Sequence, residues 1–218
     1  KVLVQRNALL KNMAEHRLFD RDSIEVWNEQ MILLAKEIHK KRTTFLDEFI
    51  PVFQKHYDSI GSENEQVHLV YKSQLNDAPM ERLLVEYERK DVFTRYSNAG
   101  IHKDDLIFEI KGHPVKKFGS QGQQKSFLIA LRLAQYEWLK EHLGVLPILL
   151  LDDIFDKLDH TRVERLMKLV ANNYFGQVLV TDTDAHRVQT IFGESDLKAT
   201  IFSVEDGKVK QLIESEAI

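Results

Sequence analysis

The hydrophobic positions divide the chain into a helical first part and a second part in which short strands alternate with helices. Apolar residues recur at steps of three and four over residues 1–17, and again from residue 24 to about residue 60. This spacing predicts a short helix followed by a long one. Asp22 or Ser23 is expected to cap the long helix, and Pro51 is expected to kink or break it.

A small α/β element is predicted between these helices and the second part of the chain. Residues 66–73 alternate between apolar and polar side chains, which is typical of a strand, and residues 80–95 show helical spacing. Two further alternating stretches, residues 106–110 and 114–118, predict a hairpin. The hairpin leads the chain into the second part.

The second part contains a run of aliphatic residues that ends in two carboxylates. Residues 148–151 show no alternation, which is typical of a strand buried on both faces of a sheet. Asp152 and Asp153 therefore lie at the carboxyl end of that strand, where ligands bind in open α/β sheets. One carboxylate there can hold Mg²⁺, and its neighbour can position a water for attack on a phosphate. The alternative is that the two Asp residues only end a strand and begin a turn.

A polar, glycine-containing run, residues 119–125, opens a strong helical pattern. Ser120 and Gln123 have the spacing of a capping box, in which each satisfies a backbone N–H group of the other. Capping alone does not require Gly122. Because the exposed N–H groups at the start of a helix also bind phosphate oxygens, we interpret the run as a phosphate-contacting site, with simple capping as the alternative.

The remaining pattern predicts an α/β sheet. A helix is expected over residues 161–173 and a short buried strand over residues 177–181, and residues 200–204 and 208–212 are expected to form a terminal hairpin. Polar residues at the end of the 177–181 strand are expected at the same sheet edge as Asp153.

Taken together, these motifs closely resemble, in order and spacing, the C-terminal half of the RecF family, bacterial DNA repair and replication proteins related to the ABC and SMC ATPases. In the terms of that family, the signature motif is matched by Ser120, Gln121, Gly122 and Gln123. Walker B is matched by Asp152 and Asp153, and the D-loop by residues 156–159. The switch residue falls at Thr181, Asp182 or Thr183, and an Asp at position 182, where ABC transporters usually have His, leaves its identity open.

The chain departs from the family in one respect that matters for nucleotide binding. It has no Gly-x-x-x-x-Gly-Lys-Ser/Thr sequence, so the Walker A loop that would wrap the β- and γ-phosphates is missing. The chain also begins with Lys1, directly in a helical pattern. We therefore expect a fragment of a longer protein whose Walker A lies in the N-terminal part, and we expect this fragment alone to be inactive.

The resemblance implies an α/β fold: part of a P-loop NTPase head of the ABC/SMC type with an inserted, mainly helical arm. Residues 1–98 would form the arm with its small α/β element, and residues 99–218 the C-terminal part of the head. The intact protein would bind ATP between two heads, with Walker A of one subunit facing the signature motif of the other. Asp152 would hold Mg²⁺, Asp153 would orient the attacking water, and Asp159 would couple the two sites.

The resemblance also implies partners for the intact protein. It would be a weak DNA-dependent ATPase that forms an ATP-dependent homodimer on duplex or gapped DNA. With the protein RecR it would help to load recombinase at gaps, in DNA damage repair, replication and the SOS response.

Composition is compatible with this interpretation. A chain of 218 residues with 43% hydrophobic content can bury one sizeable core or two smaller lobes. The absence of Cys excludes disulfides and thiolate metal sites. Because the sequence has no signal peptide and no apolar span of 18 residues, we expect a cytoplasmic protein without membrane contact.

Charge gives only weak guidance to a DNA surface. The formal net charge is −4, so any such surface must be local. A basic cluster on the long predicted helix is one candidate, although such a helical face is most often merely solvated. The cluster comprises Lys36, His39, Lys40, Lys41 and Arg42.

Two other functions remain open. The chain could belong to the head of another ABC- or SMC-like repair ATPase, but the helical region is short for the long coiled coil that such an enzyme requires. It could also be a non-catalytic module that binds DNA or protein with degenerate motifs, and the intact Asp152–Asp153 pair argues against that.

Overall fold

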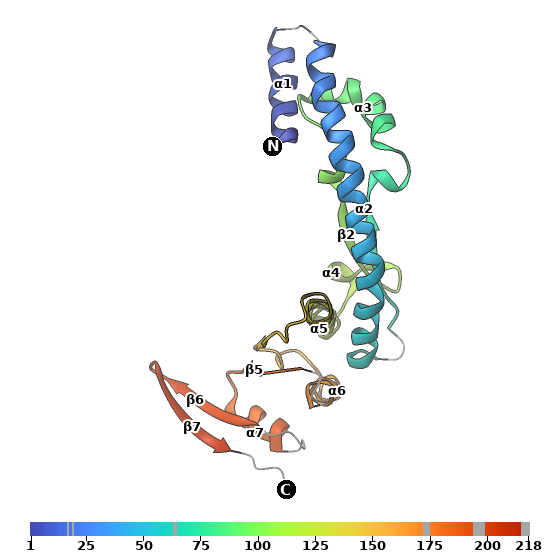
Figure 1. Cartoon of the computed structure of the whole chain (residues 1–218). Coiled ribbons are helices and arrows are strands. Elements are labelled where there is room, and N and C mark those ends of the chain that lie inside the picture. The colour runs from blue at the N-terminus through green and yellow to red at the C-terminus, as the bar shows by residue number, and fades with distance from the viewer. Residues whose placement is uncertain (17, 19, 63–64, 172–174, 194–198, 215–218) are drawn as a thin grey trace. The chain divides into compact units, whose positions relative to one another are not determined.

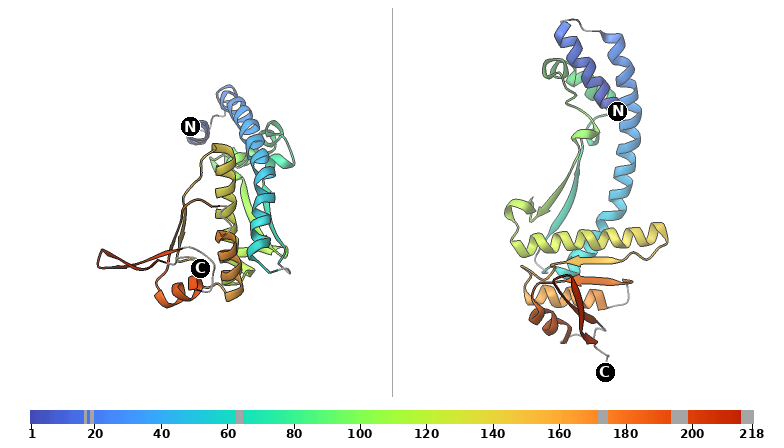
Figure 2. Two further views of the ribbon diagram at one scale, coloured as in Figure 1. Left: turned by 60° about the horizontal axis from the view of Figure 1, so that its bottom comes forward. Right: turned by 90° about the vertical axis from the view of Figure 1, so that its left-hand side faces the viewer.

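The computed structural model describes residues 1–16, 18, 20–62, 65–171, 175–193 and 199–214 (Figures 1 and 2). The chain forms two compact units. Unit 1 comprises Lys1–Ile50 and His68–Glu109, and unit 2 comprises Pro51–Val67 and Ile110–Ile218. Both units are discontinuous in sequence. The functional division into an arm, 1–98, and a head segment, 99–218, stays a prediction.

Unit 1 is mainly helical. Its helices are α1 (Val2–His16), the first part of α2 (Arg21–Ile60) and α3 (Met80–Thr94), and its strands are β1 (Val67–Lys72) and β2 (Asp105–Ile110). Two short 3₁₀ helices complete it, Gln74–Asn76 and Ile101–Lys103. The helices bury two apolar clusters, one of Met31, Ala35, Met80, Leu83, Leu84 and Ala99, the other of Leu10, Met13 and Ile24. The helical pattern predicted for this region is confirmed.

Helix α2 differs from the prediction at two points. It continues through Pro51, so the break, one of the two outcomes expected there, does not occur, and the kink stays a prediction. Phe49 and Phe53 are buried on either side of Pro51, and this packing offsets the hydrogen bond that proline removes. The helix is capped by Asp20 rather than by Asp22 or Ser23, because Asp20 Oδ1 accepts a hydrogen bond from the Ser23 N–H group at 3.1 Å.

The predicted hairpin forms only in part. Its second strand is β3 (His113–Pro114), and residues Val115–Phe118 form the short helix α4 instead. Pro114 has no N–H group with which to continue a strand ladder. The Gly119 N–H group donates to the Val115 carbonyl at 2.8 Å and closes the helical turn.

Unit 2 carries the α/β part of the fold. Strands β4 (Leu149–Asp152) and β5 (Val178–Thr181) pair in parallel, with Leu149 opposite Val178 and Asp152 opposite Thr181. The helices are α5 (Gln121–Leu143), α6 (His160–Ala171) and α7 (Ala185–Gly193). An antiparallel hairpin of β6 (Thr200–Glu205) and β7 (Lys208–Glu214) follows, as predicted. Positive φ angles at Asp206 and Gly207 suit its two-residue turn.

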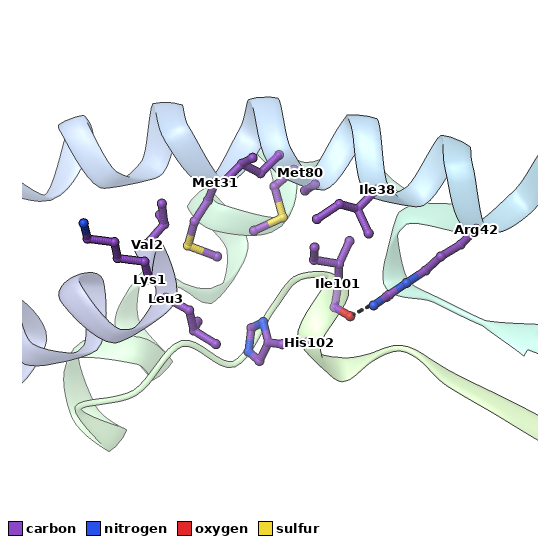
Figure 3. A pocket seen from close by; sticks show the side chains of 11 residues that line it. Lys1, Val2, Leu3, Met31, Ile38, Arg42, Met80, Ile101 and His102 are labelled. Atoms are coloured by element: carbon purple, nitrogen blue, oxygen red, sulfur yellow. Dashed lines mark hydrogen bonds between the residues drawn. The ribbon is translucent and has the colours of Figure 1, made fainter.

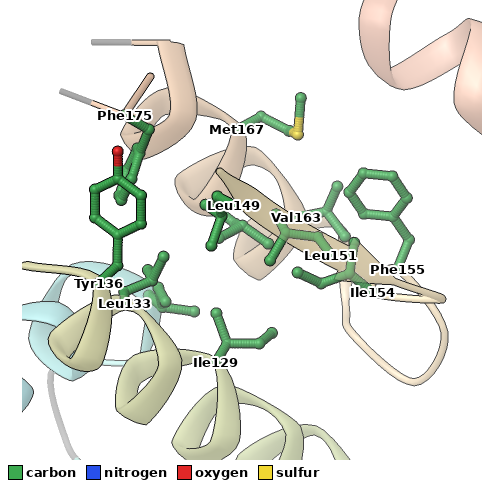
Figure 4. Packing of buried hydrophobic residues seen from close by; sticks show 12 residues of the cluster. Ile129, Leu133, Tyr136, Leu149, Leu151, Ile154, Phe155, Val163, Met167 and Phe175 are labelled. Carbon is green, nitrogen blue, oxygen red and sulfur yellow. The ribbon is translucent and has the colours of Figure 1, made fainter. Parts of the chain in front are cut away.

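The core of unit 2 lies between α5, β4 and α6 (Figure 4). Leu149 and Leu151 are buried there, 6% and 7% exposed, against residues such as Leu133 of α5 and Leu166 of α6. The opposite face of the strand pair is open, because Leu150 is 69% exposed. The prediction that this strand is buried on both faces is therefore wrong for the described chain, whose helices cover one face of β4.

Candidate functional site

The carboxyl ends of β4 and β5 bring three predicted site residues together. Thr181 Oγ1 donates a hydrogen bond to Asp152 Oδ1. The Asp153 N–H group donates to the Thr181 carbonyl at 3.1 Å and lies 3.2 Å from Thr181 Oγ1. Both carboxylates are exposed at this edge. The parallel register thus places the end of one strand against the end of the other.

The backbone turns sharply at Asp153. Its φ angle is +46°, in the left-handed region that non-glycine residues adopt rarely and that is common at functional sites. Lys125 of α5 donates from Nζ to the Asp153 carbonyl oxygen at 2.8 Å and holds this turn against the helix.

The oxygen donors at this edge fit a magnesium ion. Mg²⁺ is usually bound by one or two carboxylates and completes its shell with waters and substrate phosphates. Asp152 can supply such a carboxylate, and Asp153 lies next to it where it can orient a water. No group of three or more His, Cys, Asp or Glu side chains within the described residues is arranged to hold a metal ion by itself. A metal here would therefore need phosphate or water as further ligands.

The start of α5 has the predicted capping box. Ser120 Oγ accepts a hydrogen bond from the Gln123 N–H group at 3.2 Å, and Gln123 Oε1 accepts one from the Ser120 N–H group at 2.8 Å. Ser120 and Gln121 are exposed. The end of the helix that we interpret as phosphate-contacting is therefore both ordered by its own side chains and open to solvent.

Gly122 has a role that capping does not explain. A Cβ atom at this position would lie 3.2 Å from the carbonyl oxygen of Lys157, tighter than most such contacts. The missing side chain therefore lets the first turn of α5 approach the D-loop segment, residues 156–159. Asp159 ends that segment and caps α6, accepting from the Arg162 N–H group at 2.9 Å.

The three switch candidates have different surroundings. Thr181 contacts the carboxylate pair, as described above. Asp182 has other partners: its Oδ1 accepts from Arg187 Nη2 and from the Asp184 N–H group, each at 2.7 Å. Thr183 is exposed in the turn that leads to α7.

Comparison with known proteins identifies the group to which the chain is related. No protein-family model matches it. Proteins named DNA replication and repair protein RecF do: that of Flavobacterium johnsoniae is 51% identical over 204 residues, and that of Phocaeicola vulgatus 45% over 212 residues. These matches cover 94% and 97% of the chain. The chain corresponds to the C-terminal half of RecF. It spans 57% and 56% of the length of these two relatives.

Solved structures support the same fold. The chain resembles a RecF–ATP structure with a TM-score of 0.72 and 24% identity over 97% of its length, covering 56% of that chain. A second RecF structure gives a TM-score of 0.71 with 25% identity. An SMC head bound to the C-terminal winged-helix domain of ScpA gives 0.52 with 16% identity, covering 88% of this chain. The predicted α/β fold of a partial RecF- and SMC-like ATPase head is confirmed.

Several residues around this candidate site were not singled out from the sequence. Lys125, which donates to the Asp153 carbonyl, is the last residue of the polar run 119–125. The sequence of that run does not reveal which group Lys125 contacts. Arg162 follows Asp159 by three residues, a spacing typical of pairs in the first turn of a helix, and could have been recognised. Glu65 lies in a loop more than 50 residues before the motifs in the sequence, and no sequence pattern indicates its role.

The basic cluster and a pocket of about 250 Å³ both lie in unit 1. Lys41 pairs with Glu37 at 2.7 Å and Arg42 with Asp104 at 2.6 Å, so two of the cluster's charges are neutralised within the unit. The pocket is mostly apolar, with Arg42 and His102 at its edge (Figure 3). No helix of the described residues is long and apolar enough to cross a membrane.

Proposed function

We propose that the intact protein is a RecF-like DNA repair and replication ATPase, and that this chain supplies the signature helix, Walker B and D-loop of an ATP site formed between two subunits. The observation that carries the proposal is the placement of Asp152, Asp153 and Thr181 at one edge of a parallel strand pair. A carboxylate that can hold Mg²⁺ and a second one that can orient a water are two of the parts that phosphoryl transfer to water requires. The RecF relatives support the same function.

In this function each residue has a separate task. Asp152, oriented by Thr181, would hold Mg²⁺, and the ion would supply charge neutralisation for the phosphates. Asp153 accepts a hydrogen bond from the attacking water and orients it. Thr181, Asp182 and Thr183 remain the candidates for sensing the γ-phosphate, with Thr181 favoured by its contact with Asp152.

The signature motif acts on the nucleotide of the other subunit. Ser120 and the N–H groups of residues 121 and 122 contact the γ-phosphate, because the start of a helix carries free N–H donors and a partial positive charge. The ATP itself is held by Walker A of that other subunit. ATP thus joins the two subunits into a homodimer, and Asp159 couples the two sites.

The partners follow from the same proposal. The relatives are named for DNA replication and repair, and one solved RecF–ATP structure is described as a recombination mediator of the RecFOR pathway. We infer that the dimer works in the cytoplasm on duplex or gapped DNA, and that with RecR it helps to load recombinase during the SOS response. Exposed Lys36 and Lys40 of α2 are the unit 1 candidates for phosphate contact.

The proposal is tested by DNA-stimulated ATP hydrolysis of the full-length protein. Asp153→Asn should still bind ATP but hydrolyse it about 100-fold more slowly or worse, because the attacking water loses the carboxylate that orients it. Ser120→Arg should also bind ATP and fail in hydrolysis, because a bulky cation blocks the signature end of α5. Asp105→Asn, an exposed carboxylate in unit 1, serves as the control. Unchanged hydrolysis in both variants would show that these residues only cap a helix and end a strand.

A further inference from the structure

A buried ionic network in unit 2 connects the segments that the proposed site needs. Its centre is Arg162 at the start of α6, which is 8% exposed. The guanidinium donates from Nη2 to Glu65 Oε1 at 2.7 Å, from Nη1 to Ser126 Oγ at 2.7 Å, and from Nε to Asp159 Oδ2 at 3.0 Å. One side chain therefore binds the loop after α2, the signature helix and the D-loop segment.

Glu65 extends the network to the capping box of the signature helix. Gln123 donates from Nε2 to Glu65 Oε1 at 2.8 Å, while its Oε1 accepts from the Ser120 N–H group at 2.8 Å. An amide has a donor end and an acceptor end, so the carboxylate fixes which end faces Ser120. Tyr57 OH donates to Glu65 Oε2 at 2.9 Å and holds the carboxylate from its other side.

Both central groups are charged although they are buried. Burial raises the pKa of Glu65, but hydrogen bonds from Gln123, Arg162 and Tyr57 outweigh it and lower this pKa to about 2. Burial lowers the pKa of Arg162, and the partnership with Glu65 outweighs it, so this pKa is raised. A buried ion pair is weak evidence for stability, because desolvation of the two charges opposes their attraction. The directional hydrogen bonds of the Arg162–Glu65 pair instead fix the positions of the segments that they join.

We propose that the Arg162–Glu65 pair is a positioning device that holds Ser120 and Asp159 in one arrangement, so that the signature helix and the D-loop engage the second subunit together. The inference rests on the proposed function. Arg162 and Glu65 act through Gln123 and Asp159 and do not themselves touch ATP. The planar guanidinium fork can serve three acceptors at once, and a lysine ammonium in its place cannot do so in the same geometry.

The test variant is Arg162→Lys in the full-length protein. It keeps the positive charge but loses the fork. Glu164→Gln is the matched control, because it breaks an exposed ion pair with Lys168, 2.6 Å apart, on the same helix. Four quantities are measured: the melting temperature, ATP affinity of the single subunit, ATP-dependent dimerisation by sedimentation, and kcat and KM of DNA-stimulated hydrolysis.

In Arg162→Lys, ATP affinity of the single subunit should stay within about twofold of wild type, because Walker A is untouched. Dimerisation and kcat should fall by about 10- to 100-fold, as small misplacements of groups at a reacting centre do. Glu164→Gln should match wild type in all four quantities. Ser126→Ala, which removes one acceptor and leaves every charge in place, should weaken dimerisation by a smaller factor even if Arg162→Lys does not fold.

The inference is overturned if both Arg162→Lys and Ser126→Ala dimerise and hydrolyse ATP like wild type, whatever their melting temperatures. Asp153→Asn, measured in parallel, separates the two proposals. If Asp153→Asn abolishes hydrolysis and the Arg162 and Ser126 variants do not affect it, only the positioning inference fails. If Asp153→Asn has no effect either, the proposed function fails as well.

Discussion

Glu65 keeps its negative charge inside unit 2 because Gln123, Arg162 and Tyr57 all donate hydrogen bonds to it. Its folded-state pKa of about 2 lies below the ordinary value of 4.5. A carboxyl group with a lowered folded-state pKa stabilises the fold above its unfolded-state pKa. This stabilisation is lost as the pH falls from about 4.5 towards 2.

The pH dependence of stability should therefore differ between wild type and Glu65→Gln. The difference in unfolding free energy between the two should be constant from pH 7 to about pH 5 and narrow by roughly 2 kcal/mol by pH 3. Denaturant titrations followed by Trp138 fluorescence, in a background in which every other Trp is replaced by Phe, report on unit 2. Glu141→Gln, an exposed carboxylate on α5, controls for the loss of any carboxylate. A difference that is the same at pH 7 and pH 3 would contradict the stated role of Glu65.

Single residues were where prediction from the sequence was weakest. Arg6 lies on the apolar side of α1 and pairs with Asp91 at 2.8 Å, each side chain 1% exposed. Arg6 also donates to Ser97 Oγ at 2.7 Å. Hydrophobic periodicity cannot identify such a charge as buried, because its burial depends on partners about 90 residues away. The pairing of Arg162 with Glu65 could not be predicted for the same reason, because the two residues are 97 positions apart in the sequence.

At the scale of elements, the sequence was more informative. Helical spacing predicted α1, α3 and α6 to within a few residues, and the start of α5, because amphipathic spacing reflects burial along the element itself. Two of the failures occurred at prolines. Pro51 does not end α2, since the flanking aromatic rings are buried, whereas Pro114 does stop β3.

Pro51→Ala should stabilise the protein by about 1–2 kcal/mol, because residue 51 gains an N–H group that can donate to the Asp47 carbonyl, partly offset by a more flexible unfolded chain. The free energy of unfolding in denaturant measures this. Thr44→Ala, at an exposed position of the same helix, gives the effect of helix propensity alone, about 0.5 kcal/mol. If the free energy of unfolding rises no more in Pro51→Ala than in Thr44→Ala, the missing hydrogen bond of Pro51 does not destabilise α2.

At the scale of the whole molecule, the parallel strands and the carboxylate edge could be predicted, because the aliphatic run and the Asp pair are contiguous in sequence. The exposure of one face of the strand pair could not be predicted. The run at 148–151 suits a strand covered on both sides, yet Ile148 is 58% and Leu150 69% exposed. The chain spans only 57% of the length of a RecF relative, and sequence pattern alone does not say what lies on the second face.

The most direct test of the composite site is a mixing experiment with two inactive full-length variants, Ser120→Arg and Asp153→Asn. If the signature motif acts on the ATP of the other subunit, a mixed dimer contains one intact site and one doubly defective site. An equimolar mixture should then recover about a quarter of wild-type DNA-stimulated hydrolysis, since about half of the dimers are mixed in a two-fold symmetric assembly. A mixture as inactive as the separate variants, under conditions in which mixed dimers form, would contradict the composite site.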